Sequence, residues 1–283
     1  MSSTFITPQE RTVLIRTCEG LEELDACVQL QIDVWGYSDG DVIPRRVFIV
    51  TQKIGGQVLG AFDVSDGATD TYDRLIGFAM SLPAVHPGAV PEPYLHSHML
   101  AVRPEFRNAG VGRRLKLAQR DDAIARGFRL MEWTFDPLEI KNSFLNIHRL
   151  GAIVRRYTPN FYGVSSSRLQ GGLPTDRLHA EWWMLSGRVE AILSGAAGKP
   201  DIEQTNPNTI EDTITVPHEV GKWKSSIEDQ PRALAVQTEN RQRFQEAFAQ
   251  GLAVIDFRTD AEGNGIFGLG HWKEQPASPQ PRD

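Results

Sequence analysis

The sequence has only two cysteines in 283 residues, Cys18 and Cys27. So few cysteines exclude a disulfide-stapled scaffold, and the expected state is a pair of reduced, structural thiols in a cytoplasmic protein. The sequence also lacks any apolar run approaching the roughly 18 to 20 residues that a membrane-spanning helix needs. Its first residues, MSSTFITPQERTVLIR, contain neither the charged nor the continuous apolar part of a secretory signal. We therefore expect a cytoplasmic protein with no membrane partner.

The sequence also lacks an excess of basic residues. The chain has 30 Lys and Arg against 36 Asp and Glu, so its formal net charge is −6, and nothing in this balance predicts a nucleic-acid partner. The hydrophobic fraction of 40% and the charged fraction of 23% are those of an ordinary globular protein. No internal repeat is visible at the period of solenoids. The length suits one large domain, alone or with a smaller appendage.

Strand and helix patterns alternate over the first two thirds of the chain, which predicts an α/β (α+β) fold. Period-two and β-branched segments predict strands at 12–20, 57–65, 73–85, 94–102 and 129–135, and later in IVRRYTPNFYG and AEWWMLSG. Apolar residues at helical spacing, with Pro and Gly at the ends, predict helices at 21–35, after Pro44, at 111–126 and at 142–151.

The composition changes near residue 194, where Gly, Pro, Asn and Asp become frequent. This pattern indicates a linker or a long surface loop. Beyond it, the sequence predicts a short strand in TITVP, a helix from Pro231 to Gly251, and a hairpin of LAVIDFRT and GIFGLGHW. We therefore predict a main domain over 1–193, an α+β extension over 194–273 and a disordered tail over 274–283. The extension could complete the sheet, cover a binding site or form a homodimer, and the sequence leaves these open.

The segment R-N-A-G-V-G, residues 107–112, lies between a predicted strand and a predicted helix. Glycines at 110 and 112 remove Cβ atoms that would hold a ligand away from the backbone. Amide groups at a helix N-terminus form a positive concavity that suits phosphate, although a plain turn would also explain Gly-x-Gly. The third glycine of a Rossmann fingerprint and the Gly-Lys-Ser/Thr of a Walker loop are both missing. The two commonest nucleotide-binding loops are thereby excluded.

Arg-x-x-Gly-x-Gly, preceded by a strand that ends in Leu-Ala-Val and opening a helix, resembles the pyrophosphate-binding motif of the GNAT superfamily of acetyl-CoA-dependent N-acetyltransferases. The order of elements from about residue 11 to 190 resembles that fold too, and the resemblance is specific over 94–163. It implies a mixed, mostly antiparallel, splayed sheet flanked by helices. It also implies acetyl-CoA as co-substrate and no metal.

The resemblance implies which residues hold the cofactor. The backbone of Asn108 to Arg113 would bind the pyrophosphate, and the main chain around Leu100 and Val102 would bind pantetheine like an added strand. The implied set is Leu100, Ala101, Val102, Arg107, Asn108, Ala109, Gly110, Val111, Gly112, Arg113 and Asn142.

Asn142 resembles the GNAT asparagine that contacts pantetheine near the thioester. Asn146 is the alternative one turn later, and a plain N-cap is the other interpretation of Asn142. The side chains of the following motif helix are basic at several positions. They form either a solvated helix face or part of a site for the 3′-phosphate of coenzyme A; they are Arg113, Arg114, Lys116 and Arg120.

Two histidines precede the loop on the same predicted strand. Because side chains on a strand alternate between faces, His96 and His98 should share one face with Leu100 and Val102, opposite Ser97, Met99 and Ala101. Imidazole, with a pKa of about 6.5, is suited to take the proton of an amine whose pKa is about 10.

The run His-x-His-x-Leu-Ala-Val resembles the corresponding strand of arylalkylamine N-acetyltransferases. In that family the paired histidines assist deprotonation of the amine. A structural role at the strand edge or in the core is the alternative, and a metal pair would lack a third ligand.

One feature departs from the GNAT pattern. Many GNAT enzymes carry a tyrosine in the helix after the fifth strand that protonates the leaving thiolate, and Ile147 or His148 stands there in this sequence. Tyr157, Tyr162 and His148 are the substitutes, unless the two tyrosines are only core or pocket wall. Trp35 and Tyr37 could line an acceptor pocket or pack in the core.

These observations predict transfer of an acetyl group from acetyl-CoA to the amine of a small molecule, by direct attack in a ternary complex. Two alternatives remain open at this stage. The missing tyrosine would also fit a non-catalytic module that binds acyl-CoA, and the acceptor could be a protein N-terminus or lysine.

Overall fold

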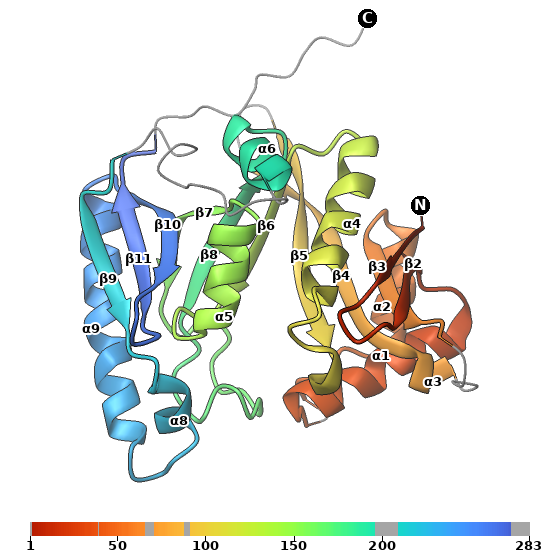
Figure 1. Ribbon diagram of the computed structural model, residues 1–283, viewed down its shortest axis with the longest axis horizontal. Coiled ribbons are helices and arrows are strands. Elements are labelled where there is room, and N and C mark those ends of the chain that lie inside the picture. The colour runs from red at the N-terminus through yellow and green to blue at the C-terminus, as the bar shows by residue number, and fades with distance from the viewer. Residues whose placement is uncertain (1, 39, 66–70, 88–90, 196–208, 273–283) are drawn as a thin grey trace, which may run out of the picture. The chain divides into compact units, whose positions relative to one another are not determined.

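The computed structural model describes residues 2–38, 40–65, 71–87, 91–195 and 209–272 (Figure 1). The chain divides into two compact units, one of residues 1–131 with 165–168 and one of residues 132–164 with 169–283. The boundary expected at residue 193 stays a prediction. The predicted tail 274–283 and most of the predicted linker lie outside the described residues.

The first unit is an antiparallel sheet in the order β1-β2-β3-β4-β5 with four helices of the α type. Its elements are β1 (Ser3–Ile6), β2 (Thr12–Thr17), α1 (Gly20–Trp35), α2 (Arg45–Lys53), β3 (Gln57–Asp63), α3 (Thr71–Arg74), β4 (Leu75–His86), β5 (Glu92–Val102), the short 3₁₀ helix η1 (Pro104–Phe106) and α4 (Val111–Ala125). The predicted strands and helices of this region are confirmed. The sequence analysis missed β1 and α3, each only four residues long.

Two clusters of buried side chains cover the two faces of this sheet. One joins α1 and α2 to the sheet through residues such as Leu30, Phe48 and Phe78, all fully buried. The other includes Leu59 and Leu115 and packs α4 against the sheet. The apolar face of α4 therefore packs the helix against the sheet, next to β5, the strand that precedes it in the chain.

The predicted alternation along β5 is wrong at one point, because the strand contains a β-bulge. Met80 of β4 pairs with Met99 and Ser81 pairs with Ser97, so His98 is an extra residue. Ser97 consequently contacts α4 through Lys116 and Gln119, on the face where Leu100 and Val102 also pack. A bulge inserts one residue into the period of two and redirects the side chains before it. Composition gives no signal for it.

The second unit carries the strand order β6-β8-β7-β10-β11-β9. Its elements are β6 (Leu130–Phe135), α5 (Ile140–Ser143), the π-helix η2 (Phe144–Arg149), β7 (Ile153–Thr158), β8 (Arg177–Trp183), α6 (Gly187–Ser194), β9 (Asp212–Val216), α8 (Val220–Lys224), α9 (Gln230–Ala249), β10 (Ala253–Thr259) and β11 (Gly265–Gly270). β10 pairs with β7 at Val254 and Val154, and β11 pairs with β9. Of the roles left open for the extension, it fulfils the first, because it completes the sheet.

The second unit differs from prediction in four places, the first of which is the strand expected over IVRRYTPNFYG, which ends at Thr158. The helix expected at 142–151 begins at Ile140 and continues as a π-helix, and the last predicted strand ends at Trp183. Two helices, α6 and α8, were not predicted. α6 has a local signal, because the Ser186 side chain accepts a hydrogen bond from the N–H of Val189 as an N-cap. Helix α9 and the β10–β11 hairpin are confirmed.

None of the helices in the described ranges is long and apolar enough to cross a bilayer.

Candidate active site

The predicted anion loop has a backbone suited to its task. Asn108 and Gly110 adopt left-handed conformations, with φ of 63° and 82°, and α4 begins at Val111. The first N–H groups of a helix have no acceptor within the helix. In α4 no side chain caps them, and no acidic residue lies in the first turn. The loop therefore presents positive backbone groups that no local side chain neutralises.

The two glycines of the loop have different reasons to be glycine. Gly110 needs to be glycine because its φ is positive. Gly112 does not, since a Cβ there would lie 3.8 Å from methyl groups of Leu100 and Val102, an ordinary contact. A helix favours Ala over Gly by about 1 kcal/mol, so the fold alone gives no reason for glycine at 112.

Helix α4 also corrects the expectation for its basic residues. Lys116 is neither solvated nor available to a phosphate, because its side chain is only 2% exposed. Its Nζ donates to the Ser97 hydroxyl at 2.7 Å, and burial lowers the pKa of the ammonium well below its usual range. The Ser97 hydroxyl in turn donates to Gln119 at 3.0 Å. This buried chain joins the helix of the anion loop to the bulge in β5.

The structure brings the two histidines together on the bulged strand. The ring centroids of His96 and His98 are 6.1 Å apart, and both side chains are half-buried. Desolvation lowers the pKa of His98 below the usual 6.5, so its imidazole is neutral at pH 7 and can accept a proton. The role of both residues as bases stays a prediction.

The three candidates for the general acid belong to the second unit and differ in how free their polar atoms are. Tyr157 donates its hydroxyl to buried Asp176, and burial together with that carboxylate raises the pKa of the phenol far above its usual range. A phenol held in this way is a poor acid. The His148 ring stacks on Phe144 with centroids 4.3 Å apart, and its Nδ1 is buried without a partner.

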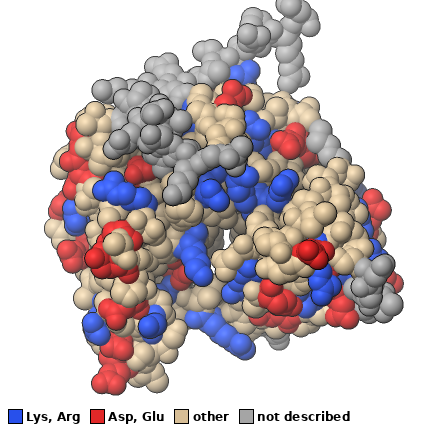
Figure 2. Space-filling model, viewed as in Figure 1, with Lys and Arg blue, Asp and Glu red and all other residues tan. Residues whose placement is uncertain are grey.

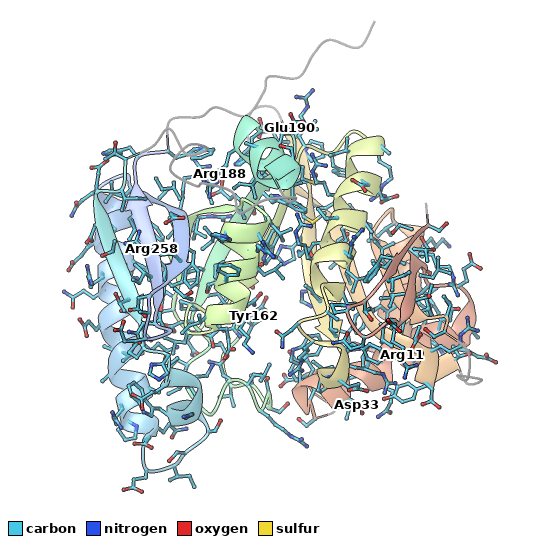
Figure 3. All side chains as sticks on the ribbon, in the orientation of Figure 1. Arg11, Asp33, Tyr162, Arg188, Glu190 and Arg258 are labelled. Carbon is cyan, nitrogen blue, oxygen red and sulfur yellow. The ribbon has the colours of Figure 1, made fainter. Side chains whose placement is uncertain are left out.

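Tyr162 is the most accessible of the three candidates. It is 46% exposed, and its hydroxyl lies 2.9 Å from the Thr134 Oγ1 of β6 (Figure 3). Geometry therefore favours Tyr162 over Tyr157.

The structure distinguishes between some of the roles considered for Asn142 and Asn146. Asn142 is the third residue of α5 and is exposed, so the N-cap interpretation is wrong; Glu139 precedes the helix instead. Asn146 is buried and donates its amide to the Asn142 Oδ1 at 3.3 Å. The side chain of Asn142 is therefore the one that a ligand could reach.

A buried ion cluster that was not predicted lies before α5. Lys224 of α8 is 3% exposed, and its Nζ lies 2.7 Å from Asp136 and 2.8 Å from Glu139. The two carboxylates raise the pKa of Lys224 against the opposing effect of burial. Because the lysine is more than eighty residues away in the chain, no local signal reveals this contact. It fixes the loop that leads into Asn142.

The remaining candidates have simpler surroundings. Trp35 and Tyr37 stack on each other at 5.3 Å and pack at the edge of the α1 and α2 core cluster. Within the described part of the chain, no three His, Cys, Asp or Glu side chains are placed to hold a metal ion. In the view of Figure 2, both basic and acidic side chains occur on the described surface.

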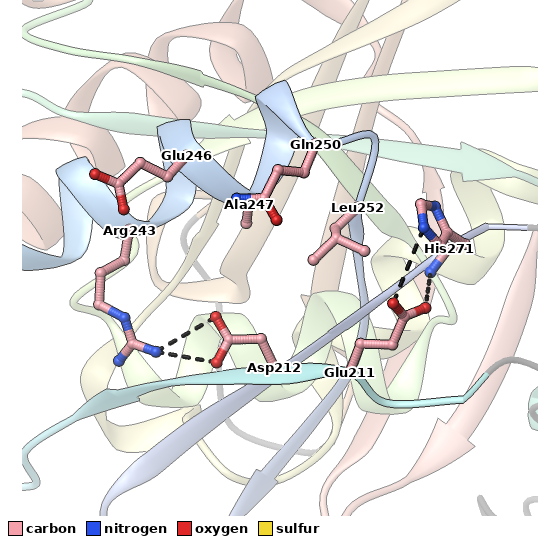
Figure 4. A pocket seen from close by; sticks show the side chains of 8 residues that line it. All are labelled: Glu211, Asp212, Arg243, Glu246, Ala247, Gln250, Leu252 and His271. Carbon is pink, nitrogen blue, oxygen red and sulfur yellow. Dashed lines mark hydrogen bonds and ion pairs between the residues drawn. The ribbon is translucent and has the colours of Figure 1, made fainter.

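A pocket in the extension contains none of the predicted site residues (Figure 4). Most of its charged groups have partners within the pocket, since Arg243 pairs with Asp212 and His271 lies 3.9 Å from Glu211. Its lining residues are Glu211, Asp212, Arg243, Glu246, Ala247, Gln250, Leu252 and His271.

Comparison with known proteins agrees with this geometry. Residues 48–142, about a third of the chain, match the model of the acetyltransferase (GNAT) family. The matched segment runs from α2 to α5 and includes the histidine strand, the anion loop and Asn142. The chain thus contains a GNAT acetyltransferase segment, and this match gives acetyltransferase as its enzyme class. The predicted fold, an open, mixed and mostly antiparallel sheet flanked by helices, is confirmed.

Several solved structures are similar at low identity. Arabidopsis thaliana NAA60 in complex with acetyl-CoA is 14% identical with a TM-score of 0.49, over 60% of this chain and 99% of that one. The ribosomal-protein-S18-alanine N-acetyltransferase from Escherichia coli is 15% identical with a TM-score of 0.44, over 60% and 92%. At these values neither likeness bears on the acceptor. No curated protein matches the chain significantly.

Proposed function

We propose that this protein transfers an acetyl group from acetyl-CoA to the primary amine of a small molecule by direct attack. The observation that carries the proposal is the open N-terminus of α4 beside Gly112, a glycine that the packing does not require. The backbone from Asn108 to Arg113, with Arg107 and Ala109 in the same loop, would hold the diphosphate. The strand residues Leu100 to Val102 and the side chain of Asn142 would hold the pantetheine arm.

The histidine strand supplies the base in this proposal. Acetyl-CoA would supply the activated acyl group as a thioester. An alkylammonium has to lose a proton before it can attack, and His98 or His96 takes that proton directly or through water. The bulge at His98 supports this placement, because a bulge leaves backbone groups unpaired that can bind a carbonyl oxygen. The run His-x-His resembles the corresponding strand of arylalkylamine N-acetyltransferases, and this resemblance supports the proposed role.

Tyr162 is the proposed acid. Its exposed hydroxyl shares a hydrogen bond with Thr134 and can give its proton to the leaving thiolate. Tyr157 and His148 are the less suitable alternatives, because the Tyr157 hydroxyl is bonded to buried Asp176 and the Nδ1 of His148 is buried. A non-catalytic acyl-CoA-binding module and a protein N-acetyltransferase remain the rival functions.

Two measurements test the proposal. Calorimetry with coenzyme A should show binding to the wild-type chain. Gly112→Ala should weaken it by tenfold or more, because the new methyl group would lie beside Leu100 and Val102, the strand residues proposed to hold the cofactor. The same variant should be as stable as the wild type or more stable, since the fold accommodates the methyl group. Equal affinity in both proteins would remove the diphosphate from this loop.

Turnover separates the rival functions. Incubation with acetyl-CoA and a panel of small amines should release free thiol above the hydrolysis background. Binding of coenzyme A without thiol release from any amine or peptide would favour the non-catalytic module. Release with peptides alone would favour the protein N-acetyltransferase.

A further inference from the structure

A charged surface on one face of β6, β7 and β8 has no part in the function proposed so far. Two consecutive arginines, Arg155 and Arg156, point to this face because β7 also contains a bulge. Val154 pairs with Ala180 and Arg156 with His179, so Arg155 is the extra residue. In a regular strand two neighbours would point to opposite faces. The bulge instead places two guanidinium groups side by side.

Both guanidinium groups are held from beneath by buried carboxylates. Arg155 makes two hydrogen bonds to Glu181, which is 6% exposed, and Arg156 donates to Glu132, which is 9% exposed. The arginines themselves remain 49% and 50% exposed. Anchored arginines with half of their surface in solvent retain N–H donors for a further acceptor. Their rotamers are already fixed, so binding would cost little further entropy.

The same face continues to Tyr162 through ring contacts. His179 shares a hydrogen bond with Thr158 at 2.8 Å. Its ring also contacts the Phe161 ring, and Phe161 contacts the Tyr162 ring. Arg177 lies 5.4 Å over the Tyr162 ring. Burial and the nearby Arg156 lower the pKa of His179 to about 4, so it is neutral at pH 7. Trp133 and Trp182 pack together on the opposite face.

Charge on this face has the opposite sign to the whole chain. Three guanidinium groups face two carboxylates there, whereas the protein carries a formal net charge of −6. A single guanidinium can recognise a carboxylate through two parallel hydrogen bonds. We propose that Arg155 and Arg156 bind a carboxylate of the acceptor, so that the substrate is an amine that also carries an acid group, such as an amino acid. This inference rests on the proposed function, in which Tyr162 lies at the reacting end.

The first experiment compares acceptors that differ only in the carboxylate. Phenylalanine and phenethylamine form one pair, and lysine and cadaverine form another, with thiol release measured from acetyl-CoA. We expect the carboxylated member of a pair to have a kcat/KM about tenfold higher or more. Arg156→Lys keeps the charge beside Glu132 and loses the planar fork, so it should abolish most of this preference.

Arg258→Lys is the matched control. Arg258, labelled in Figure 3, is also a half-exposed strand arginine near a carboxylate, but it lies on β10 and its carboxylate is Asp256 instead of Glu132 or Glu181. Its substitution should leave the preference unchanged. Equal kcat/KM values for both members of each pair in the wild type, or an unchanged preference in Arg156→Lys, would overturn the proposal. A tenfold loss of coenzyme A affinity in Arg156→Lys would overturn it too, because the anion bound would then be a cofactor phosphate.

A binding measurement keeps the inference separate from the activity. N-acetylphenylalanine, titrated by calorimetry into the full chain saturated with coenzyme A, should bind more tightly than N-phenethylacetamide, and Arg156→Lys should remove the difference. This comparison decides the question even if no amine is turned over. If coenzyme A fails to bind, the proposed function fails, and the same two probes added to the protein alone still test the arginine pair.

Discussion

We expect substitution by Met to affect the stability of the fold in opposite ways at two buried lysines, Lys224 and Lys116. Lys224 has two carboxylate partners and a raised pKa, whereas Lys116 donates to a serine hydroxyl and has a pKa lowered by burial. Lys224→Met leaves Asp136, only 10% exposed, without its cation. Removing one partner of a buried pair costs about 3 to 5 kcal/mol, and we expect about 3 because Glu139 can reach solvent.

Lys116→Met removes an ammonium from a place that disfavours its charge. The Ser97 hydroxyl keeps Gln119 as its acceptor, so the rest of the buried chain stays bonded. We therefore expect this variant to be at least as stable as the wild type at pH 7. A loss of 3 kcal/mol in Lys116→Met, equal to that of Lys224→Met, would refute the distinction.

The pH dependence gives the signs. A lysine whose pKa is raised on folding contributes stability that is complete below about pH 10.5 and is lost as the pH rises through its folded pKa, so the deficit of Lys224→Met should close only above pH 10.5. A lysine whose pKa is lowered makes the wild type gain stability as the pH rises toward 10.5, so the advantage of Lys116→Met should shrink over pH 7 to 10.5. Urea unfolding at pH 7, 9 and 10.5, followed by tryptophan fluorescence, measures both. A constant gap for Lys116→Met over this range, or a deficit of Lys224→Met that closes below pH 10.5, would refute the assignment of charge states.

The remaining predictions concern the catalytic groups. Replacing both His96 and His98 by Ala should lower turnover by about 10² to 10⁴ at neutral pH while coenzyme A affinity stays nearly intact; unchanged turnover would remove them from the mechanism. If His98 is the base, the acidic limb of kcat/KM in the wild type should fall below pH 6.5, because burial lowers its pKa; a limb above pH 7 would contradict this. Tyr162→Phe should reduce kcat by tenfold or more, whereas Tyr157→Phe should act mainly on stability by leaving Asp176 one hydrogen bond short; the reverse result would exchange their roles.

The sequence predicted those parts of the fold that follow from local periodicity. Helices such as α1 and α4 and strands such as β3 and β5 carry their patterns over six or more residues, and each was placed within about two residues. The anion loop was also found, because its signal is local: two glycines between a strand and a helix. Lys116 was misjudged because a basic residue on an amphipathic helix is normally solvated. Its burial depends on Ser97 and on the strand bulge beside it.

Both proposed functional surfaces depend on bulges for which the sequence gives no signal. At His98 and at Arg155 one extra residue changes which side chains share a face, and the period-two rule then fails. The cost of a bulge is an interrupted ladder, and it is tolerated where a side chain has to be redirected. The sequence located the histidines and the loop between 107 and 112, but the side chains that share a face with His98, and the arginine pair, needed the structure.

The extension is also held by contacts between residues that are far apart in the sequence. Arg241 of α9 binds Asp176, whose side chain is 0% exposed, and Lys224 binds the loop before Asn142. Strand β10 covers the edge of β7. A chain cut after residue 195 would therefore leave two buried carboxylates without cations and one strand without its neighbour, and we expect it not to fold as a stable unit. Cooperative unfolding of such a fragment with wild-type stability would contradict this expectation. It would show that the extension is a separable domain and that its ion pairs do not stabilise the rest of the chain.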